Sequence, residues 1–347
     1  MAQVITTLRC AFRLDGVEDP DLGAALVELE VIAKENQPVR CTATFAAGPE
    51  GGDIRARQGL DFGHQLQVAR GDLPLFSGAV VALGLRRPAT GAPLLRVVAE
   101  DALGGLSRAR RTRTFSDRSD ADLVRQVAVD HGLQPEVELP GPALGQVAQV
   151  ATTDLDFLAD RLHRLDARMW VEDRVLHVRV PQIQPAAGLR VSMGQELREF
   201  TVLADVRGQH EALSAVAWDV SAKAGLRATA TDGDLGPETL GGATGGGILS
   251  QAFGSASEVE AWPLAATGAE ALAQAQASFR RGARRFVSGQ GVAELDGRIA
   301  PGATLVIQGL GTSFSGAYLV TQVRHRFDPT HGYRTEFNAE RPALGRA

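Results

Sequence analysis

The sequence predicts an α+β fold, mainly β, with two related β domains and small inserted α/β modules. Three observations lead to this class. Apolar and polar residues alternate along much of the first hundred residues, as they do in half-buried antiparallel strands. Two segments in the middle of the chain change to the spacing of amphipathic helices. A faint internal repeat links residues 62–87 with residues 301–325.

The first β domain is predicted from alternation. Residues 27–31 and 39–45 place apolar side chains at every second position, with polar side chains between them, and an alternating row also runs through residues 4–14 as Val4, Thr6, Leu8, Cys10, Phe12 and Leu14. A Gly-rich stretch at 48–53 reads as a turn between strands. Short strands separated by such turns predict an all-β barrel or sandwich for this part of the chain.

The middle of the chain predicts a small α+β unit. Ser119 precedes a helical pattern with Asp122 three residues on, and Thr153 precedes a second pattern with Asp156 at the same spacing. A hydroxyl three residues before a carboxylate is typical of a helix start, because each side chain bonds the other's backbone N–H. A short hairpin is expected after the second helix.

Later segments predict a return to strands, interrupted by an insertion. Residues 233–258 are Gly-rich and almost without pattern, so we expect a long, loose loop there. A helix is expected at about 270–285, starting with the capping box Thr267…Glu270 and with arginines in its last turn at the negative end of its dipole. The predicted domains are a first β domain (1–104), an inserted α+β module (105–204), a second β domain (205–225 and 286–342), a Gly-rich loop and helix insertion (226–285) and a short tail (343–347).

The repeat is the most informative feature. Phe76, Ser77, Gly78 and Ala79 match Phe314, Ser315, Gly316 and Ala317, in the same order and without a gap. These are the predicted structural repeat positions. Gly78 and Gly316 are expected at equivalent places, where a glycine allows a bulge or a close backbone approach. The alternative is a chance likeness of two hairpins.

Composition excludes several classes of protein. Hydrophobic residues make up 44% and charged residues 22%, as in an ordinary folded protein of two domains. A net charge of −5 gives no basic domain, so we expect no nucleic-acid specificity. The basic run Arg108, Arg110, Arg111 and Arg113 is expected at a solvated strand or loop edge.

Cysteine usage and the N-terminus predict folding in the cytoplasm. Cys10 and Cys41 are the two cysteines, and both lie in alternating patterns that predict buried side chains without a disulfide or a zinc site. No signal peptide is recognised at the start, and no apolar stretch is long enough for a membrane span.

The search for reactive chemistry predicts no catalytic residues, no cofactor and no metal site. The sequence contains no H-E-x-x-H, P-loop or G-x-S-x-G motif. Asp154 and Asp156 are two residues apart on a helix start and point apart, so they are poor acid/base partners. His325 and His331 are expected at a surface turn rather than at a metal.

Several segments together resemble a known family. They are Phe76–Gly78, the run RRTRTFSDRSDADLVRQVAVDHGL at 110–133, TDLDFLADRLHRLDARMWVEDRVLHV at 153–178, PGATLVIQG at 301–309, FSGAYLVTQVRHRFD at 314–328 and GYRTEF at 332–337. Their order and spacing are similar to the baseplate central hub proteins of contractile injection systems. That family includes the phage late-control D proteins and the hub region of VgrG.

The resemblance implies a structural role and a set of partners. It implies a homotrimer, each chain with two related β-barrels and inserted α/β modules, forming a quasi-six-fold ring. Such a ring joins a three-fold spike to a six-fold inner tube, and it carries no catalytic residues. The expected partners are a separate spike protein, an inner tube (tube initiator) protein, other baseplate components, and a tape measure or cargo in the lumen. The alternatives are a tail-associated cell-wall hydrolase and a carbohydrate- or peptide-binding β module.

Overall fold

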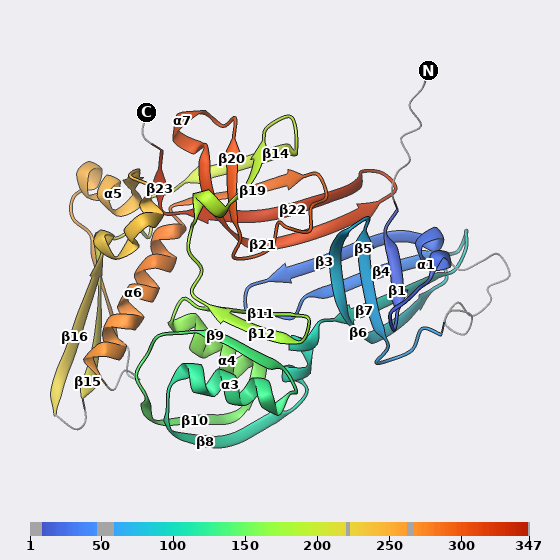
Figure 1. The fold of residues 1–347 in the computed structure, drawn as a ribbon. Coiled ribbons are helices and arrows are strands. Elements are labelled where there is room, and N and C mark those ends of the chain that lie inside the picture. The colour runs from blue at the N-terminus through green and yellow to red at the C-terminus, as the bar shows by residue number, and fades with distance from the viewer. Residues whose placement is uncertain (1–8, 47–58, 220–222, 262–266, 346–347) are drawn as a thin grey trace.

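A computed structural model describes residues 9–46, 59–219, 223–261 and 267–345. One large, mostly antiparallel sheet runs through the molecule, with two smaller modules packed beside it (Figure 1). This agrees with the predicted α+β, mainly β, class. None of the helices in the described part of the chain has the length and apolarity that a membrane crossing needs.

The first β unit follows the predicted alternation. Its elements are β1 (Ala11–Leu14), β2 (Val17–Glu18), α1 (Pro20–Ala25), β3 (Leu26–Lys34), β4 (Arg40–Ala46), β5 (Gln65–Arg70), β6 (Leu73–Arg86) and β7 (Leu94–Glu100). In β4, Cys41, Ala43 and Phe45 are buried in a common core, while Arg40 is exposed. Burial of one strand face against the other strands is what the period of two requires.

The second β unit surrounds a core of its own. Its elements are β13 (Leu189–Ser192), β14 (Leu197–Ala204), β19 (Val287–Ala293), β20 (Thr304–Gln308), α7 (Gly311–Phe314), β21 (Gly316–Asp328), β22 (Gly332–Arg341) and β23 (Ala343–Leu344). The strand order β14-β19-β22-β21-β20 repeats the order β3-β4-β7-β6-β5 of the first unit. The two units are joined because β21 also pairs with β3.

The α+β module has the predicted helices. Its elements are the 3-10 helix η1 (Ala102–Ser107), β8 (Arg110–Arg118), α3 (Asp120–Asp130), β9 (Gln134–Glu138), β10 (Leu144–Thr153), α4 (Asp154–Arg164), β11 (Arg168–Glu172), β12 (Val175–Arg179) and the 3-10 helix η2 (Pro185–Ala187). The hydroxyls of Ser119 and Thr153 accept from the backbone N–H of Asp122 and Asp156, which confirms both helix starts.

A second module packs one long helix on a small sheet. Its elements are β15 (Ala212–Asp219), β16 (Ala224–Thr231), the 3-10 helix η3 (Asp232–Thr239), β17 (Ala243–Thr244), α5 (Gly245–Phe253), β18 (Ser257–Ala261) and α6 (Gly268–Arg284). In Figure 1, α6 lies alongside β15 and β16. Thr267 and Glu270 form the predicted capping box of α6.

The expectation of a loose loop at 233–258 was wrong, because this segment contains η3, β17, α5 and part of β18. The glycines have a packing role that local pattern does not reveal. A Cβ at Gly245 would overlap the Gln209 and Phe286 side chains, and one at Gly246 would overlap the backbone of His210. The start of α5 therefore packs directly against Gln209, His210 and Phe286, which leaves no room for a side chain at either glycine.

Strand pairing also differs from the predicted boundaries. We placed 205–225 in the second β domain, but β15 pairs with β16 and β18 instead. We ended the α+β module at residue 204, but β13 and β14 pair with β20 and β19 of the large sheet. Both differences depend on hydrogen bonds between strands far apart in the sequence, which alternation alone cannot assign. The division into domains, and the closure of each β unit into a barrel, remain predictions.

Candidate functional site

The predicted repeat positions lie in comparable hairpins but not at equivalent places. Phe76, Ser77 and Gly78 are inside β6, whereas Phe314 ends α7 and Gly316 begins β21. β5 and β6 are joined by a tight turn, while α7 is inserted before β21. The matched residues consequently sit at different depths along the two strands, and the expectation that Gly78 and Gly316 correspond was wrong.

Pairing registers give the true relationship between the two β units. Ala79 pairs with Glu100 in the first unit, and Leu319 pairs with Glu340 in the second. The sequence separation between Ala79 and Leu319 is therefore the same as that between Glu100 and Glu340. The same displacement relates Val80 to Val320: the N–H of Gly63 donates to the carbonyl of Val80 at 2.9 Å, and Gly302 makes the corresponding bond.

Two irregularities in the sheet recur at corresponding positions, whereas the shift between Val68 and Ala69 has no counterpart in the β20–β21 pairing. In the first unit, one register shift lies between β6 and β7 and another between β3 and β4. In the second unit, the corresponding shifts lie between β21 and β22 and between β14 and β19. The shifts fall between Val80 and Ala82 and between Val320 and Gln322, and again between Leu26 and Glu28 and between Leu197 and Glu199. A bulge requires a local insertion in one strand, so two coincident bulges are strong evidence that the units are duplicates.

The duplicated units meet in one edge contact, where β21 pairs with β3. His325 lies opposite Val31, and these side chains are 6% and 1% exposed. Burial lowers the pKa of His325 to about 4, so its ring is neutral at physiological pH. On the other face, Arg324 and Arg326 both approach Glu30, at 3.3 and 3.7 Å. The contact therefore has an apolar side and a charged side.

Two other strand edges have no partner within the described residues. β14 beyond Leu197 pairs only with β19, and β6 beyond Val80 pairs only with β7. Large apolar side chains are exposed on both: Leu203 of β14 is 58% exposed, and Leu85 of β6 is 65% exposed. Exposed edges with apolar side chains are sites at which another strand adds.

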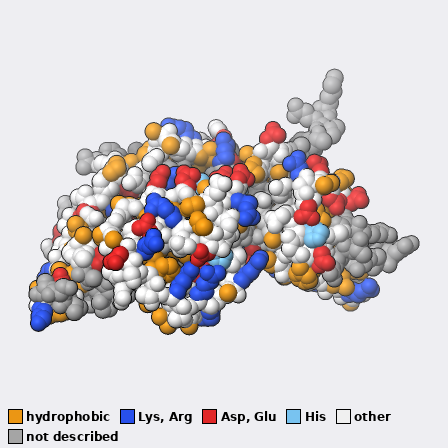
Figure 2. Space-filling model, turned by 60° about the horizontal axis from the view of Figure 1, so that its bottom comes forward, with side chains coloured by type: hydrophobic (Ala, Val, Ile, Leu, Met, Phe, Trp, Pro, Cys, Tyr) orange, Lys and Arg blue, Asp and Glu red, His pale blue; other side chains and the backbone are white. Residues whose placement is uncertain are grey.

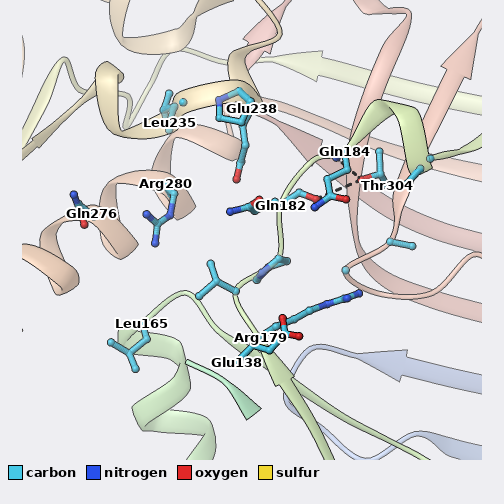
Figure 3. A pocket seen from close by; sticks show the side chains of 18 of the residues that line it. Glu138, Leu165, Arg179, Gln182, Gln184, Leu235, Glu238, Gln276, Arg280 and Thr304 are labelled. Carbon is cyan, nitrogen blue, oxygen red and sulfur yellow. Dashed lines mark hydrogen bonds between the residues drawn. The ribbon is translucent and has the colours of Figure 1, made fainter. Parts of the chain in front are cut away.

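A cleft of about 1030 Å³ opens where the second β unit meets both modules (Figure 3). Glu138 and Arg179 line it from the α+β module, Gln276 and Arg280 from α6, and Thr304 from β20. Several lining groups already bond other residues. Gln276 donates to Asp234 at 2.8 Å, and the hydroxyl of Thr304 accepts from the N–H of Gln184 at 2.9 Å.

Arg284 fixes the junction behind this cleft, and its role was missed by the sequence analysis. The side chain is 1% exposed and donates to both carboxylate oxygens of Glu238, each at 2.7 Å. It also donates to Asp166 at 2.8 Å and to the carbonyl of Pro181 at 3.0 Å. Burial acts to lower the pKa of Arg284, but the bonds to Glu238 and the charge of Asp166 raise it above its ordinary value. The arginine stays charged and links three parts of the chain.

The basic run has a more specific place than the solvated edge we expected. Asp154 is 1% exposed and accepts from Arg113 at 2.8 Å, Gln149 at 2.9 Å and His131 at 2.8 Å. Burial acts to raise the pKa of Asp154, but the His131 and Gln149 hydrogen bonds and the charge of Arg113 hold it below its usual range. Arg111 also approaches Asp154, at 3.3 Å. This cluster joins β8, α3 and α4.

The remaining candidates do not assemble a reactive site. His331 lies at the exposed turn before β22, as predicted, but His325 is buried in β21. Cys10 and Cys41 are buried and free. Within the described residues, no group of three or more His, Cys, Asp or Glu could hold a metal ion. Acidic and basic side chains are interspersed over the face drawn in Figure 2, with basic ones gathered near its lower middle.

Solved structures of tail proteins have the same fold. The chain is similar to the 43 kDa tail protein of prophage MuSo2 from Shewanella oneidensis, with 11% identity, a TM-score of 0.68 and coverage of 97% of this chain and 99% of that one. A tail protein from Neisseria meningitidis MC58 shows 11% identity, a TM-score of 0.67 and 96% coverage of both chains.

A third similar structure comes from a secretion system. It is the Escherichia coli c3393 protein, described as a type VI secretion system component structurally similar to the T4 tail proteins gp27 and gp5. It shows 14% identity, a TM-score of 0.61 and coverage of 97% of this chain and 79% of that one. No curated protein matches the sequence. A family model described as the Alg8 N-terminal domain matches residues 63–328, and the chain therefore belongs to that family.

Proposed function

We propose that this chain is a structural component of the baseplate of a phage tail or phage-tail-like injection particle, and that it is the central hub. The duplication carries the proposal. Two β units with the same strand order and the same bulges lie in one chain. A ring built from one repeated contact takes its symmetry from the number of equivalent units. Three copies would present six.

The fold likeness supports this proposal, because it extends over nearly the whole length of two tail proteins, one of them from a prophage. In the proposed assembly, a homotrimer binds a separate spike protein on its three-fold face. The first ring of the inner tube binds its quasi-six-fold face. Other baseplate components surround the ring, and a tape measure or cargo occupies the lumen. Assembly takes place in the cytoplasm.

The arrangement of polar residues supports a structural role. The two most buried ionic groups, around Arg284 and Asp154, bond segments of the chain to one another. The Arg284 group joins the two modules, the Asp154 group joins elements within the α+β module, and in both groups the carboxylates are occupied. The competing proposal of a cell-wall hydrolase predicts clearing of a peptidoglycan suspension, which the hub does not.

Light scattering tests the assembly. The full chain is measured alone and in mixtures with candidate spike and tube proteins. We expect the mass of three chains, and a larger complex when the spike is added. A single-chain mass in every mixture would overturn the hub.

A further inference from the structure

The pairing of β21 with β3 inside the chain is a model for how its two unpaired strand edges, on β6 and β14, can pair with another copy. Within the chain, residues 322–326 of β21 pair with residues 30–34 of β3. The displacement that relates Val80 to Val320 makes residues 82–86 of β6 the counterpart of the first segment. The register shifts put Glu199 of β14 in the place of Glu28 of β3, so β14 is the counterpart of β3.

Among the residues that the structure describes, the counterparts lack the partner that their duplicates have. His325 and Val31 are buried opposite each other, but the corresponding Leu85 is 65% exposed and Val202 is only half-buried. Leu203, the counterpart of Ile32, is 58% exposed. An apolar side chain at an unpaired edge gains stability when a strand covers it.

One molecule cannot satisfy both edges by itself. β14 ends the strand order on the side of the second unit, and β6 lies beyond β3, β4 and β7 in the first. Figure 1 places β14 near the top of the molecule and β6 at its lower right. The strand that fits each edge best is therefore the matching strand of another copy.

We propose that residues 82–86 of β6 in one copy pair antiparallel with residues 201–204 of β14 and the following Asp205 in a second copy, with Leu85 opposite Val202. The register is that of the β21–β3 contact carried over by the duplication. Ala82 then lies opposite Asp205, and Arg86 lies opposite Thr201. Each chain has one edge of each kind, so the contact is head-to-tail and continues from copy to copy. The number of copies that closes the ring rests on the proposed function.

The charges on the two edges agree with this pairing. Arg86 is exposed on β6, and Glu199 is exposed on β14, two residues beyond the proposed partner Thr201. Diagonal neighbours on one face of an antiparallel pair lie within reach of long side chains. An Arg86–Glu199 pair would take the place of the contacts that Arg326 makes with Glu30 and Glu336 at 3.7 and 3.3 Å.

Disulfide trapping tests the register directly. Leu85→Cys and Val202→Cys are prepared as separate single variants and mixed under mild oxidation. Directly opposite positions on adjacent strands come close enough for a disulfide. The native thiols should contribute little, since both are buried and burial raises the pKa of Cys10 to about 11. We expect a reducible dimer in the mixture and little in either variant alone.

The matched control is Leu85→Cys mixed with Leu203→Cys. Position 203 is one residue out of register and faces the other side of the strand, so we expect at least a tenfold lower yield of dimer. Equal yields from both mixtures would overturn the proposed register. A three-chain mass with no Leu85–Val202 crosslink would overturn the edge contact and leave the hub standing, whereas a single-chain mass would overturn both.

Loss of assembly on a charge substitution provides a second measurement. Leu85→Lys places a cation in the proposed apolar contact, and Val129→Lys changes a similarly exposed residue of α3, which is 62% exposed. We expect Leu85→Lys to shift the mass to single chains at concentrations where Val129→Lys does not, with unchanged circular dichroism in both. If Leu85→Lys assembles normally, the proposed edge contact is wrong.

Discussion

Arg284 and Asp166 are 118 residues apart in the sequence, yet the guanidinium of one donates to both carboxylate oxygens of the other, at 3.0 and 2.8 Å. The pair joins the end of α6 to the loop after α4. It is buried, because Arg284 is 1% and Asp166 is 7% exposed. Buried charges are tolerated only when they are paired, so this contact holds the second module against the α+β module.

Replacing Arg284 should be strongly destabilising. Arg284→Ala leaves Glu238 and Asp166 buried without their shared cation, which should lower the free energy of unfolding by about 3–5 kcal/mol. Chemical denaturation of the full chain measures this. Arg285→Ala is the matched control, because Arg285 is the next residue and is exposed. Equal effects of the two substitutions would contradict the role given to Arg284.

Asp101 should make stability depend on pH. Burial raises the pKa of Asp101 to about 7, and only one of its carboxylate oxygens has a bonding partner, the N–H of Leu103. A raised pKa in the folded state means that its stabilising contribution is fully present below the unfolded pKa of about 4. That contribution is lost as pH rises through 7.

Asp101→Asn removes this titration. The variant should gain stability relative to the native chain as pH rises from 4 to 8, by an amount on the order of a few kcal/mol. Because burial also raises the pKa of Glu340 to about 7, the difference between the two unfolding curves is the quantity to measure. Exposed Asp72→Asn is the control. A difference that stays constant between pH 4 and 8 would contradict the prediction.

Gly78 should be intolerant of a side chain even though its backbone is ordinary for a strand. A Cβ at this position would overlap the backbone carbonyl of Glu100 on the neighbouring strand β7 and the ring of Phe76. Because the neighbour is backbone, the sheet itself must shift, and Gly78→Ala should cost about 1–3 kcal/mol. Gly84→Ala, in the same strand, meets nothing closer than 3.8 Å and should cost less. Thermal unfolding of the two variants distinguishes them.

The sequence by itself determined the local structure well. Alternation predicted strands such as β4, since one face of each strand must be buried. The hydroxyl–carboxylate spacings at Ser119, Thr153 and Thr267 predicted three helix starts, because a cap is formed by residues three apart in the chain. The Phe-Ser-Gly-Ala match led us to predict a duplication, but the four matched residues are not at corresponding places in the two units.

Only the tertiary structure decided how these elements combine. The correspondence of Val80 with Val320 became visible only in the pairing of the strands. A short insertion such as α7 changes which residues match in the sequence, but it does not change which residues of the neighbouring strands are hydrogen-bonded. Arg284 reads as a surface cation near a helix end, and its burial depends on Glu238 and Asp166, which are distant in sequence. Strand pairing and charge burial are set by partners far along the chain, and local pattern carries no information about them.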